Sequence, residues 1–322
     1  MNGGAAPEVV GLGSCTVDYF AMVPKILGPE EKVNCRDLHV YAGGVTANNL
    51  TQVARLGLWT GWFGKIGDDG NGKLLLQAFE EDGMDVSHVE VVPGRLSSSA
   101  WIPVDPGGGR CIYMFPNVTK EITAEEVESR HADYIRSARA LHTEVSQLPI
   151  GPVLKAMEIA RGAGVMVLLD LDVDPSYFTL VAGLGTLSEL TKALRLTDVL
   201  APCKAAAEEL TGEKDPERMV LKLLSYGPRM VVVSDGARGC VLGTDGEAVR
   251  IPAYRVDVVD TTGAGDAFHG GLSFGLLKGW DLARTGRFAN ACGALCCMRV
   301  GARAMARLEE VWAFLGTAEP LP

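Results

Sequence analysis

Short, uninterrupted runs of apolar residues recur along the chain, separated by longer segments with helical spacing. Three of these runs are rich in β-branched or aliphatic residues: Val9 to Gly13, Val165 to Asp172 and Met230 to Ser234. Strands that are covered on both faces have this composition, whereas strands with one solvated face alternate between apolar and polar residues. The pattern therefore predicts buried strands of a parallel sheet.

Apolar residues with helical spacing occupy the segments between these runs. The clearest are Leu154 to Arg161, Lys204 to Leu210, and Lys278 to Val300. Thr211 and Gly212 follow the second segment and form a typical helix end. Strands that alternate with helices form parallel sheets through crossover connections. We therefore expect residues 1–322 to form one α/β domain with a doubly wound, mostly parallel sheet.

Residues 96–116 follow a different pattern. Alternating stretches from Ser97 to Val104 and from Cys111 to Phe115 flank a turn that contains three consecutive glycines. This pattern predicts a β-hairpin, and a hairpin inside an α/β chain is a candidate lid. We expect lid strands at about 14–42 and 95–116, with residues near Trp101, Ile102 and Tyr113 closing over a ligand. Exposed lid edges favour pairing into a homodimer.

The net charge of −10 restricts the classes of partner. Nucleic acids and anionic membranes favour a basic surface, so we expect neither as the main partner. Residues 1–7 lack a basic segment and an apolar run, and apolar runs elsewhere are too short to cross a bilayer. These features predict a cytoplasmic protein. An acidic protein can still bind an anionic ligand where backbone dipoles attract it.

The candidate chemistry lies in the string from Asp260 to Asp266, Asp-Thr-Thr-Gly-Ala-Gly-Asp, which leads into a helical pattern. Its glycines allow close backbone approach, and the N–H groups of Gly263, Ala264 and Gly265 at a helix start form an anion hole. Asp266 would repel a resting phosphate. It fits a base that takes a proton from an alcohol as the alcohol attacks a phosphoryl group. Taken alone, Asp266 fits an ordinary helix N-cap equally well.

The complete string resembles the C-terminal signature of the ribokinase-like (PfkB-type) carbohydrate kinases. Further segments resemble the same family in order along the chain: Gly11 to Asp18, Ala42 to Gly57, Gly64 to Gly72, Val231 to Gly239 and Phe288 to Ala291. The resemblance covers nearly the whole chain. It implies a ribokinase-like fold, a sugar as substrate, and ATP with Mg²⁺ as cofactors.

The sugar side of the site is expected near the N-terminus. Asp18, expected at the C-terminal end of the first strand, can accept hydrogen bonds from two neighbouring hydroxyls, and Asn48 offers both a donor and an acceptor. Gly43 and Gly44 leave room for a sugar ring. The alternative is that Asp18 and the two glycines are ordinary turn residues.

The nucleotide side rests on the family resemblance. It implies that Ser234, Gly236 and Gly239 lie near the phosphates or ribose of ATP, and that Asn290 lies near adenine. The family often binds a monovalent cation beside the anion hole. Asp260 and the Thr262 carbonyl match two of its ligands, as do the carbonyls of Cys296 and Gly301. Met305 stands where some members have a serine ligand, which leaves K⁺ as an open question.

Two departures from the family pattern concern Mg²⁺. Cys203 and Ala206 stand where members usually carry the Asn and Glu of an Asn-x-x-Glu motif. The chain also has Asp170, Asp172 and Asp174 where Asp-x-Asn is common. These acids are either metal ligands at a strand end or solvated carboxylates, and both interpretations stay open.

We expect an ATP-dependent kinase that transfers the γ-phosphoryl group to a hydroxymethyl group of a sugar or sugar derivative, with Asp266 as general base. One alternative is a relative that binds sugar and nucleotide without phosphoryl transfer, since the Asn-x-x-Glu motif is missing. Another is a nucleoside kinase, whose base pocket could use Tyr19, Phe20 and Tyr41. Lid contacts select the sugar, and the sequence pattern does not define them.

Overall fold

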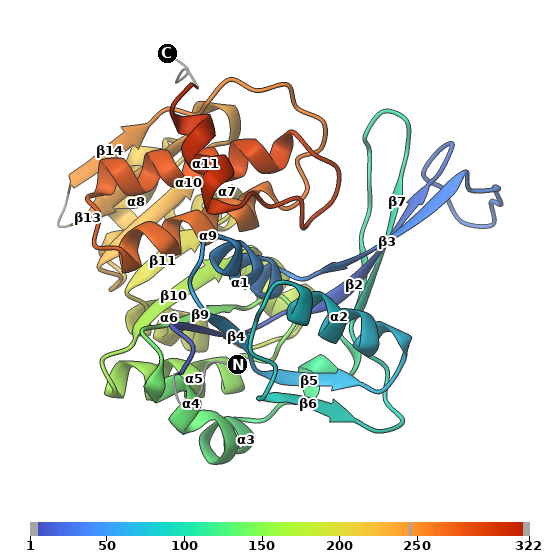
Figure 1. The fold of residues 1–322 in the computed structure, drawn as a ribbon, viewed down its shortest axis with the longest axis horizontal. Coiled ribbons are helices and arrows are strands. Elements are labelled where there is room, and N and C mark those ends of the chain that lie inside the picture. Colours follow the sequence, from blue (N-terminus) through green and yellow to red (C-terminus); the bar gives the residue numbers. More distant parts are fainter. Residues whose placement is uncertain (1–5, 245–246, 318–322) are drawn as a thin grey trace.

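An eight-stranded sheet forms the centre of the molecule (Figure 1). The computed structural model describes residues 6–244 and 247–317. Within them the strand order is β14-β13-β12-β11-β10-β9-β1-β4; β12 to β4 run parallel, and β13 and β14 are antiparallel additions. The bounds are β1 Val9–Leu12, β4 Thr60–Trp62, β9 Ala140–Glu144, β10 Met166–Leu171, β11 Val199–Pro202, β12 Met230–Ser234, β13 Cys240–Thr244 and β14 Glu247–Ile251. The expected doubly wound, mostly parallel sheet is confirmed.

Both faces of this sheet are buried, which explains the uninterrupted apolar runs. Leu168 and Val232 join the hydrophobic core on one face, and their neighbours Leu169 and Val231 join the core on the other. Side chains alternate between the faces of a strand, so a strand covered on both sides favours apolar residues at successive positions.

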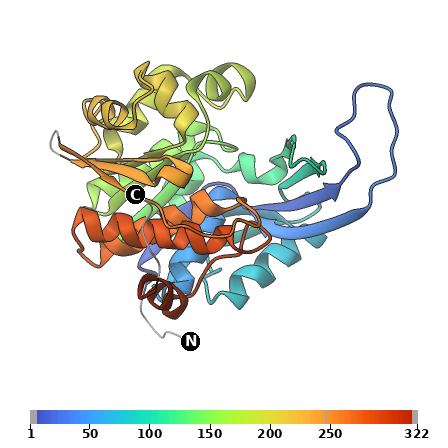
Figure 2. The same cartoon turned by 90° about the horizontal axis from the view of Figure 1, so that it is seen from above.

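Helices cover the two faces in separate layers (Figure 2). One layer contains α1 Val45–Arg55, α2 Gly70–Glu81, α9 Ala264–Leu277, α10 Leu282–Cys297 and α11 Leu308–Leu315. The other contains α4 Ala132–Ser137, α5 Ile150–Gly162, α6 Leu187–Leu196, α7 Lys204–Thr211 and α8 Pro216–Leu224, with the short α3 Ala124–Glu126 next to α5. Among the described residues, no helix combines the length and the apolar composition that a membrane span requires.

The predicted elements are confirmed except at one helix boundary. The three predicted strands appear as β1, β10 and β12, and two of the predicted helices appear as α5 and α7. The third prediction, a helix from Lys278 to Val300, is wrong at its start. Lys278 ends α9, and Asp281 begins α10 by accepting a hydrogen bond from the Arg284 N–H (2.7 Å). Helical spacing continues across this break, so periodicity alone did not reveal it.

A second sheet, called the lid sheet here, projects from the main body (Figure 1). Its order is β3-β2-β7-β8, with β2 Thr16–Met22, β3 Asp37–Gly43, β7 Ser99–Val104 and β8 Tyr113–Phe115. β7 and β8 are antiparallel neighbours around the glycine-rich turn, which confirms the predicted hairpin. The strands β5 Gly64–Gly67 and β6 Val89–Val92 form a separate parallel pair.

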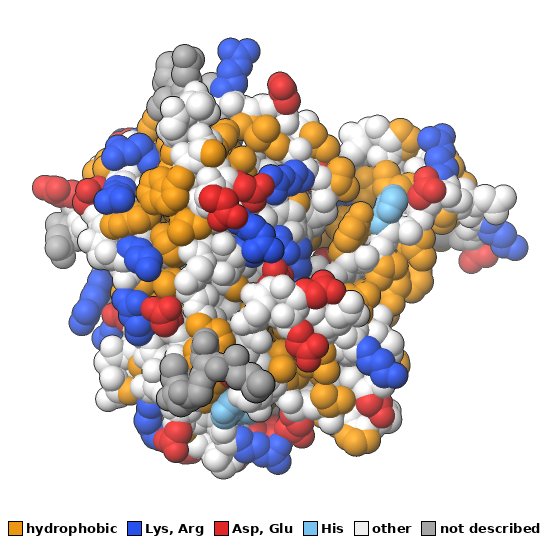
Figure 3. All heavy atoms as spheres, viewed as in Figure 1, with side chains coloured by type: hydrophobic (Ala, Val, Ile, Leu, Met, Phe, Trp, Pro, Cys, Tyr) orange, Lys and Arg blue, Asp and Glu red, His pale blue; other side chains and the backbone are white. Residues whose placement is uncertain are grey.

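The two faces of the lid sheet differ in exposure. Phe20 and Ile102 are buried on the face toward the main body. Trp101 and Tyr113 are exposed on the opposite face, where the Tyr19 ring stacks on the Trp101 ring with 5.0 Å between centroids. Hydrophobic side chains are visible on the projecting part in Figure 3. The residue alternation of the strands thus gives the lid sheet one inner and one outer apolar face.

Helix α9 packs closely against its neighbours because small residues lie on its contact faces. A Cβ atom at Gly270 would lie 2.5 Å from the Gln52 Cβ of α1, and one at Gly271 would lie 2.8 Å from the Cys292 Sγ of α10. Close packing fixes the position of α9. Its first turn consequently lies at the edge where the parallel strands end.

Candidate active site

Two cavities lie beyond the carboxyl ends of the parallel strands, and the first turn of α9 separates them. The lid cavity, of about 510 Å³, lies under the lid sheet; its polar lining includes Ser14, Asp18, Asn48, Asp172 and Asp266. The α10 cavity, of about 390 Å³, is lined by residues of β12, α9 and α10, including Ser234, Phe268 and Asn290. Gly265 lines both cavities. Ligands of open α/β sheets bind at this edge.

The loop before α9 is held by the carboxylate of Asp260. Its Oδ1 accepts a hydrogen bond from the Thr262 N–H (2.9 Å), and its Oδ2 accepts one from the Gly301 N–H (3.0 Å). Gly263 has a φ of 77°, and a Cβ atom there would lie 2.1 Å from the Ala302 carbonyl oxygen. Only glycine fits this conformation and this space. The loop is therefore built to present the start of α9 to the cavities.

The start of α9 offers donors and positive charge to an anion. The Gly265 N–H belongs to the first helical turn, where no preceding helical carbonyl can accept it, and the helix dipole adds positive potential. The Ala264 N–H donates to the Thr261 carbonyl (3.2 Å), so the turn itself uses one of the three predicted donors. Arg110 of the lid hairpin reaches the Thr262 hydroxyl (3.2 Å) and adds a cation beside the loop.

Asp266 faces the lid cavity, and its carboxylate is held in place. Its Oδ2 accepts a hydrogen bond from the Asn48 Nδ2 (2.7 Å). Burial raises the pKa of Asp266 to about 7, with a further rise from Asp170 and Asp18, against the opposing effects of Asn48 and His269. A carboxylate that titrates near neutral pH at a cavity wall is suited to accept a proton.

A buried ion pair lies behind Asp266. The His269 Nδ1 is 2.5 Å from the Asp170 Oδ2, which also accepts a hydrogen bond from the Asn49 Nδ2 (3.2 Å). Burial alone would lower the pKa of His269, but the carboxylates of Asp170 and Asp266 outweigh that effect and raise it. His269 therefore favours its protonated form more than a free imidazole does, and it lies one helical turn from Asp266 without lining the lid cavity.

The acidic residues after β10 have different environments. Asp170 is occupied by His269 and Asn49, and Asp174 accepts a hydrogen bond from the Tyr177 N–H (2.7 Å). Asp172 lines the lid cavity, and its carboxylate makes no hydrogen bond within residues 6–244 and 247–317. Asp172 is thus the acid in this group that is available to a ligand.

Asp18 lies in β2 of the lid sheet and not at the end of the first strand, which corrects the expected position. It is 8% exposed and lines the lid cavity. Burial raises the pKa of Asp18 to about 7, against the opposing effect of the Arg303 guanidinium. A Cβ atom at Gly43 would lie 2.1 Å from the Asp18 Oδ2, so this carboxylate takes the room that Gly43 leaves. Gly44 lines the cavity directly.

Residues near the three expected lid positions line the lid cavity, but Trp101 and Tyr113 themselves do not. Ile102 lines the lid cavity together with Phe20 and Ala100. Trp101 and Tyr113 lie on the outer face of the lid sheet, 48% and 58% exposed, because neighbouring strand residues point to opposite sides. The sequence pattern identified the lid strands but not which of their alternating side chains face the cavity.

The three aromatic residues considered for a nucleoside base separate in space. Tyr19 lies on the outer face of the lid sheet, and its hydroxyl donates to the Asn71 Oδ1 (2.6 Å). Phe20 and Tyr41 line a neighbouring cavity of about 610 Å³, with ring centroids 5.9 Å apart. Only two of the three could therefore contact a common ligand.

All four predicted nucleotide-binding residues, Ser234, Gly236, Gly239 and Asn290, line the α10 cavity. The Asn290 Nδ2 donates to the carbonyls of Ile251 (3.2 Å) and Pro252 (3.0 Å), so this amide also fixes the segment after β14. Much of the remaining wall is apolar, including Tyr254, Val256, Val258, Phe268 and Ala294. Such a wall suits a flat heterocycle.

The residues in place of the Asn-x-x-Glu motif have structural roles. Cys203 is the N-cap of α7, and its Sγ accepts a hydrogen bond from the Ala206 N–H (3.4 Å). Burial raises the pKa of Cys203 to about 11, which keeps the thiol neutral. Ala206 is fully buried. Lys204 lies 3.6 Å from Asp235, which adds a cation beside the loop after β12.

Three basic residues at the site were not among the predicted ones: Arg110, His269 and Arg303. His269 follows Asp266 by three positions, so helical spacing could have placed both on one face. The side chains of Arg110 and Arg303 reach the site from loops through tertiary contacts with Thr262 and Asn48. No local pattern encodes such contacts.

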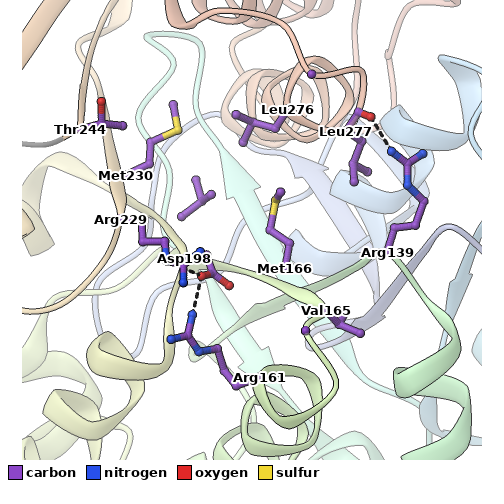
Figure 4. Close-up of a pocket in the computed structure, with 13 residues that line it drawn as sticks. Arg139, Arg161, Val165, Met166, Asp198, Arg229, Met230, Thr244, Leu276 and Leu277 are labelled. Atoms are coloured by element: carbon purple, nitrogen blue, oxygen red, sulfur yellow. Dashed lines mark hydrogen bonds and ion pairs between the residues drawn. The ribbon is translucent and has the colours of Figure 1, made fainter.

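A larger cavity, of about 650 Å³, lies at the opposite edge of the sheet and contains none of the predicted site residues (Figure 4). Its arginines are already engaged: Arg139 donates to the Leu277 carbonyl (2.5 Å), and Arg161 and Arg229 both pair with Asp198. The candidate active site is therefore the pair of cavities at the carboxyl edge.

Comparisons with known proteins agree with this architecture. The sequence profile of the pfkB family carbohydrate kinases matches residues 6–308. The ribokinase of Staphylococcus aureus is 30% identical over 312 residues, which cover 94% of this chain and 98% of that protein. A structure of Arabidopsis thaliana ribokinase complexed with ribose and ATP has a TM-score of 0.84 at 25% identity, covering 96% and 99% of the two chains. A putative ribokinase II from E. coli, in complex with ATP and Mg²⁺, has a TM-score of 0.84 at 26% identity, covering 96% and 99%.

The doubly wound sheet, the lid sheet and the cavities at the carboxyl edge define a ribokinase-like protein. The match over residues 6–308 is more specific: the chain belongs to the pfkB family of carbohydrate kinases. The resemblance noted from the motifs is confirmed, and the protein is a sugar kinase. The roles of individual site residues stay predictions.

Proposed function

We propose that this kinase transfers the γ-phosphoryl group of ATP to a hydroxymethyl group of a sugar or sugar derivative. The observation that carries the proposal is the position of residues 261–266 between the two cavities. Ala264 lines the α10 cavity, Asp266 lines the lid cavity, and Gly265 lines both. A phosphoryl group bound at this turn is within reach of a ligand in either cavity.

Asp266 acts as the general base in this mechanism. It accepts the hydroxyl proton while the acceptor oxygen attacks the γ-phosphorus. The new O–P bond forms as the bond between the γ-phosphorus and the bridging oxygen of ADP breaks, and ADP leaves with that oxygen. The N–H groups of Gly263 and Gly265 and the α9 dipole stabilise the charge on the transferring group. The lid sheet excludes water as a competing acceptor.

Asp18 and Asn48 orient the sugar in the lid cavity, next to Gly43 and Gly44. The Asp18 carboxylate accepts hydrogen bonds from two neighbouring hydroxyls, and its ionised form provides the stronger acceptor. Asn48 holds Asp266 with one N–H of its amide, which leaves its second N–H for a hydroxyl oxygen. The base and the sugar-binding residues are thereby linked.

ATP occupies the α10 cavity in this proposal, with adenine near Asn290 and the phosphates toward Ser234, Gly236 and Gly239. The complex of the putative E. coli ribokinase II with ATP and Mg²⁺ supports ATP as the phosphoryl donor, and the lining of the α10 cavity supports its place there. Mg²⁺ prefers oxygen ligands and keeps several waters when it binds nucleotide phosphates. Asp172 is a carboxyl group in the lining of the lid cavity, and its oxygens fit this preference. It would hold the metal, whose charge neutralises the phosphates.

The proposed mechanism includes no step through a monovalent cation. The oxygens implied as K⁺ ligands each accept a hydrogen bond within the protein: Asp260 from Thr262 and Gly301, Thr262 from the Cys296 thiol, Cys296 from Arg299, and Gly301 from Ala304. Each carbonyl oxygen has two lone pairs, so one hydrogen bond leaves it able to bind a cation. The assay is therefore run with and without K⁺.

A coupled ADP-release assay tests the proposal. The panel contains ribose, fructose, ketodeoxy sugar acids, phosphosugars and nucleosides, each with and without Mg²⁺ and K⁺. We expect Mg²⁺-dependent ADP release with at least one sugar, and a phosphate monoester on its hydroxymethyl group by NMR. Release with nucleosides alone would favour a nucleoside kinase. ADP release without a phosphorylated product, or none with any acceptor, would contradict the proposal.

A further inference from the structure

Arg303 lies in the loop between α10 and α11, and its guanidinium is enclosed by the protein. Its Nη1 and Nη2 are buried and make no hydrogen bond within the residues that the structure describes. The guanidinium carbon lies 5.4 Å from the centre of the Phe79 ring. A buried cation with so few partners is costly, because it loses its hydration without full replacement. Stability alone therefore does not explain this side chain.

The one side-chain hydrogen bond of Arg303 leads to the candidate base. Its Nε donates to the Asn48 Oδ1 (3.1 Å), and the Asn48 Nδ2 donates to the Asp266 Oδ2 (2.7 Å). A carboxamide can rotate so that its oxygen and nitrogen exchange places. The guanidinium has only N–H donors, so it can pair with the amide oxygen of Asn48 and not with the amide nitrogen. The amide nitrogen is therefore directed toward Asp266. Each contact from Arg303 through Asn48 to Asp266 therefore joins a donor to an acceptor.

Other titratable groups surround this chain of contacts. Cys15, Asp18, Asp82 and Arg55 face Arg303, and Asp170, His269 and Asp18 face Asp266. Asp82 is already paired with Arg55 (2.7 Å), and Asp170 with His269 (2.5 Å). Asp18 faces both ends but hydrogen-bonds to neither within the described residues, so Asn48 is the group that joins them by hydrogen bonds.

We infer that Arg303 is a positioning residue for phosphoryl transfer: it fixes the Asn48 carboxamide so that the Asp266 carboxylate is held in place and aimed at the acceptor hydroxyl. The inference rests on the proposed function, because it needs Asp266 as the base. It assigns Asn48 a second role beside sugar binding. The backbone carbonyl of Arg303 accepts a hydrogen bond from the Arg55 Nη1 (2.8 Å), and any side chain at this position would keep that bond. The arginine side chain therefore needs a separate reason, and the contact with Asn48 supplies one.

The test compares Arg303→Met, Arg303→Lys and Asn48→Ala, the double variant Arg303→Met/Asn48→Ala, and a control, Arg299→Met. Arg299 is in the same loop but forms a half-exposed ion pair with Glu310 (2.5 Å). For each variant, kcat and KM are measured from pH 5 to 9, together with the thermal unfolding midpoint. The wild type is first shown to phosphorylate its sugar; if it does not, the proposed function fails before the inference is tested.

For Arg303→Met we expect kcat to fall by up to about 10², the loss typical of a misplaced catalytic group. The KM for ATP stays unchanged, and the acidic limb of the kcat profile moves to higher pH, because a freed Asn48 no longer stabilises ionised Asp266. The unfolding midpoint stays the same or rises, since a costly buried cation is removed. Arg303→Lys recovers part of kcat, and Arg299→Met matches the wild type.

In the Asn48→Ala background, Arg303→Met should change kcat no further, because the shared partner is already absent. Independent, additive losses would overturn the inference. An unchanged kcat and pH profile in Arg303→Met would overturn it too, and the proposed function would stand. If Arg303→Met does not fold, Arg303→Lys decides: a wild-type kcat and pH profile overturn the inference, and a lowered kcat with a shifted acidic limb supports it.

Discussion

At the scale of single residues, the site concentrates carboxylates that are costly to ionise. Burial raises the pKa of both Asp18 and Asp266 to about 7, far above the ordinary 3.8. Asn48 and the cations His269 and Arg303 offset only part of this cost. Active sites commonly sacrifice stability in this way to hold groups at a useful pKa.

The substitution Asp18→Asn should show this cost. The folded chain retains the Asp18 proton up to a pH near 7, whereas the unfolded chain loses it near 3.8. This residue therefore lowers the free energy of unfolding by about 1.4 kcal/mol for each pH unit from about 4 to about 7. In urea unfolding, we expect Asp18→Asn to raise the free energy of unfolding above that of the wild type by more at pH 8 than at pH 5. We expect the variant to be inactive at both pH values. An equal effect at the two pH values would contradict the assigned pKa.

A site residue could be predicted from the sequence when its neighbours in the site are also its neighbours in the chain. Asp266 and its glycines are contiguous, so one string carried the prediction. Asp18 was predicted as a sugar ligand from its motif, but its strand was wrong because the chain leaves the main sheet after Leu12. Arg303 meets Asn48 across 255 positions, and only the folded chain brings them together.

At the scale of elements, the close contact of α9 with α1 and α10 sets the position of the first turn. Gly270→Ala should destabilise the protein by about 1–3 kcal/mol, because its Cβ would lie 2.5 Å from the Gln52 Cβ. Gly151→Ala in α5 is the control, since a Cβ there meets no atom within 4 Å. Thermal unfolding measures both. A Gly270→Ala protein as stable as Gly151→Ala would mean that α9 and α1 are not packed this tightly.

The strands and most helices were predictable because their burial imposes a pattern on every residue. Runs such as Met230 to Val233 are apolar throughout since both faces of the sheet are covered. The lid sheet gave a weaker signal, because both of its faces carry apolar residues. Trp101 and Ile102 are equally hydrophobic neighbours, and only their packing distinguishes the outer face from the inner one.

At the scale of the whole molecule, the outer face of the lid sheet supports the predicted homodimer. Leu38, Val40, Trp101, Tyr113 and Phe115 are each between 39% and 58% exposed. Large exposed apolar patches are uncommon on monomers and mark interaction surfaces. A second copy of the chain can cover this face by the same residues, as two-fold symmetry requires.

We therefore predict a dimer in sedimentation velocity experiments at micromolar concentration. Replacing Trp101 and Tyr113 together by Lys should yield monomers, because the charges would be buried at the contact. Leu180→Lys is the control, since Leu180 is 83% exposed on the main body. A monomeric wild type, or a double variant that remains dimeric, would contradict this assignment.

The most direct measurement concerns the carboxylate that faces the lid cavity. In Asp266→Asn the amide keeps the size of the side chain but accepts no proton from the acceptor hydroxyl. We predict that kcat for the preferred sugar falls by about 10²–10⁴, while ATP binding and the circular dichroism spectrum stay those of the wild type. Asp257→Asn, an exposed acid in the same connecting segment, should retain full turnover. Turnover by Asp266→Asn within about tenfold of the wild type would contradict the role of Asp266 as the base.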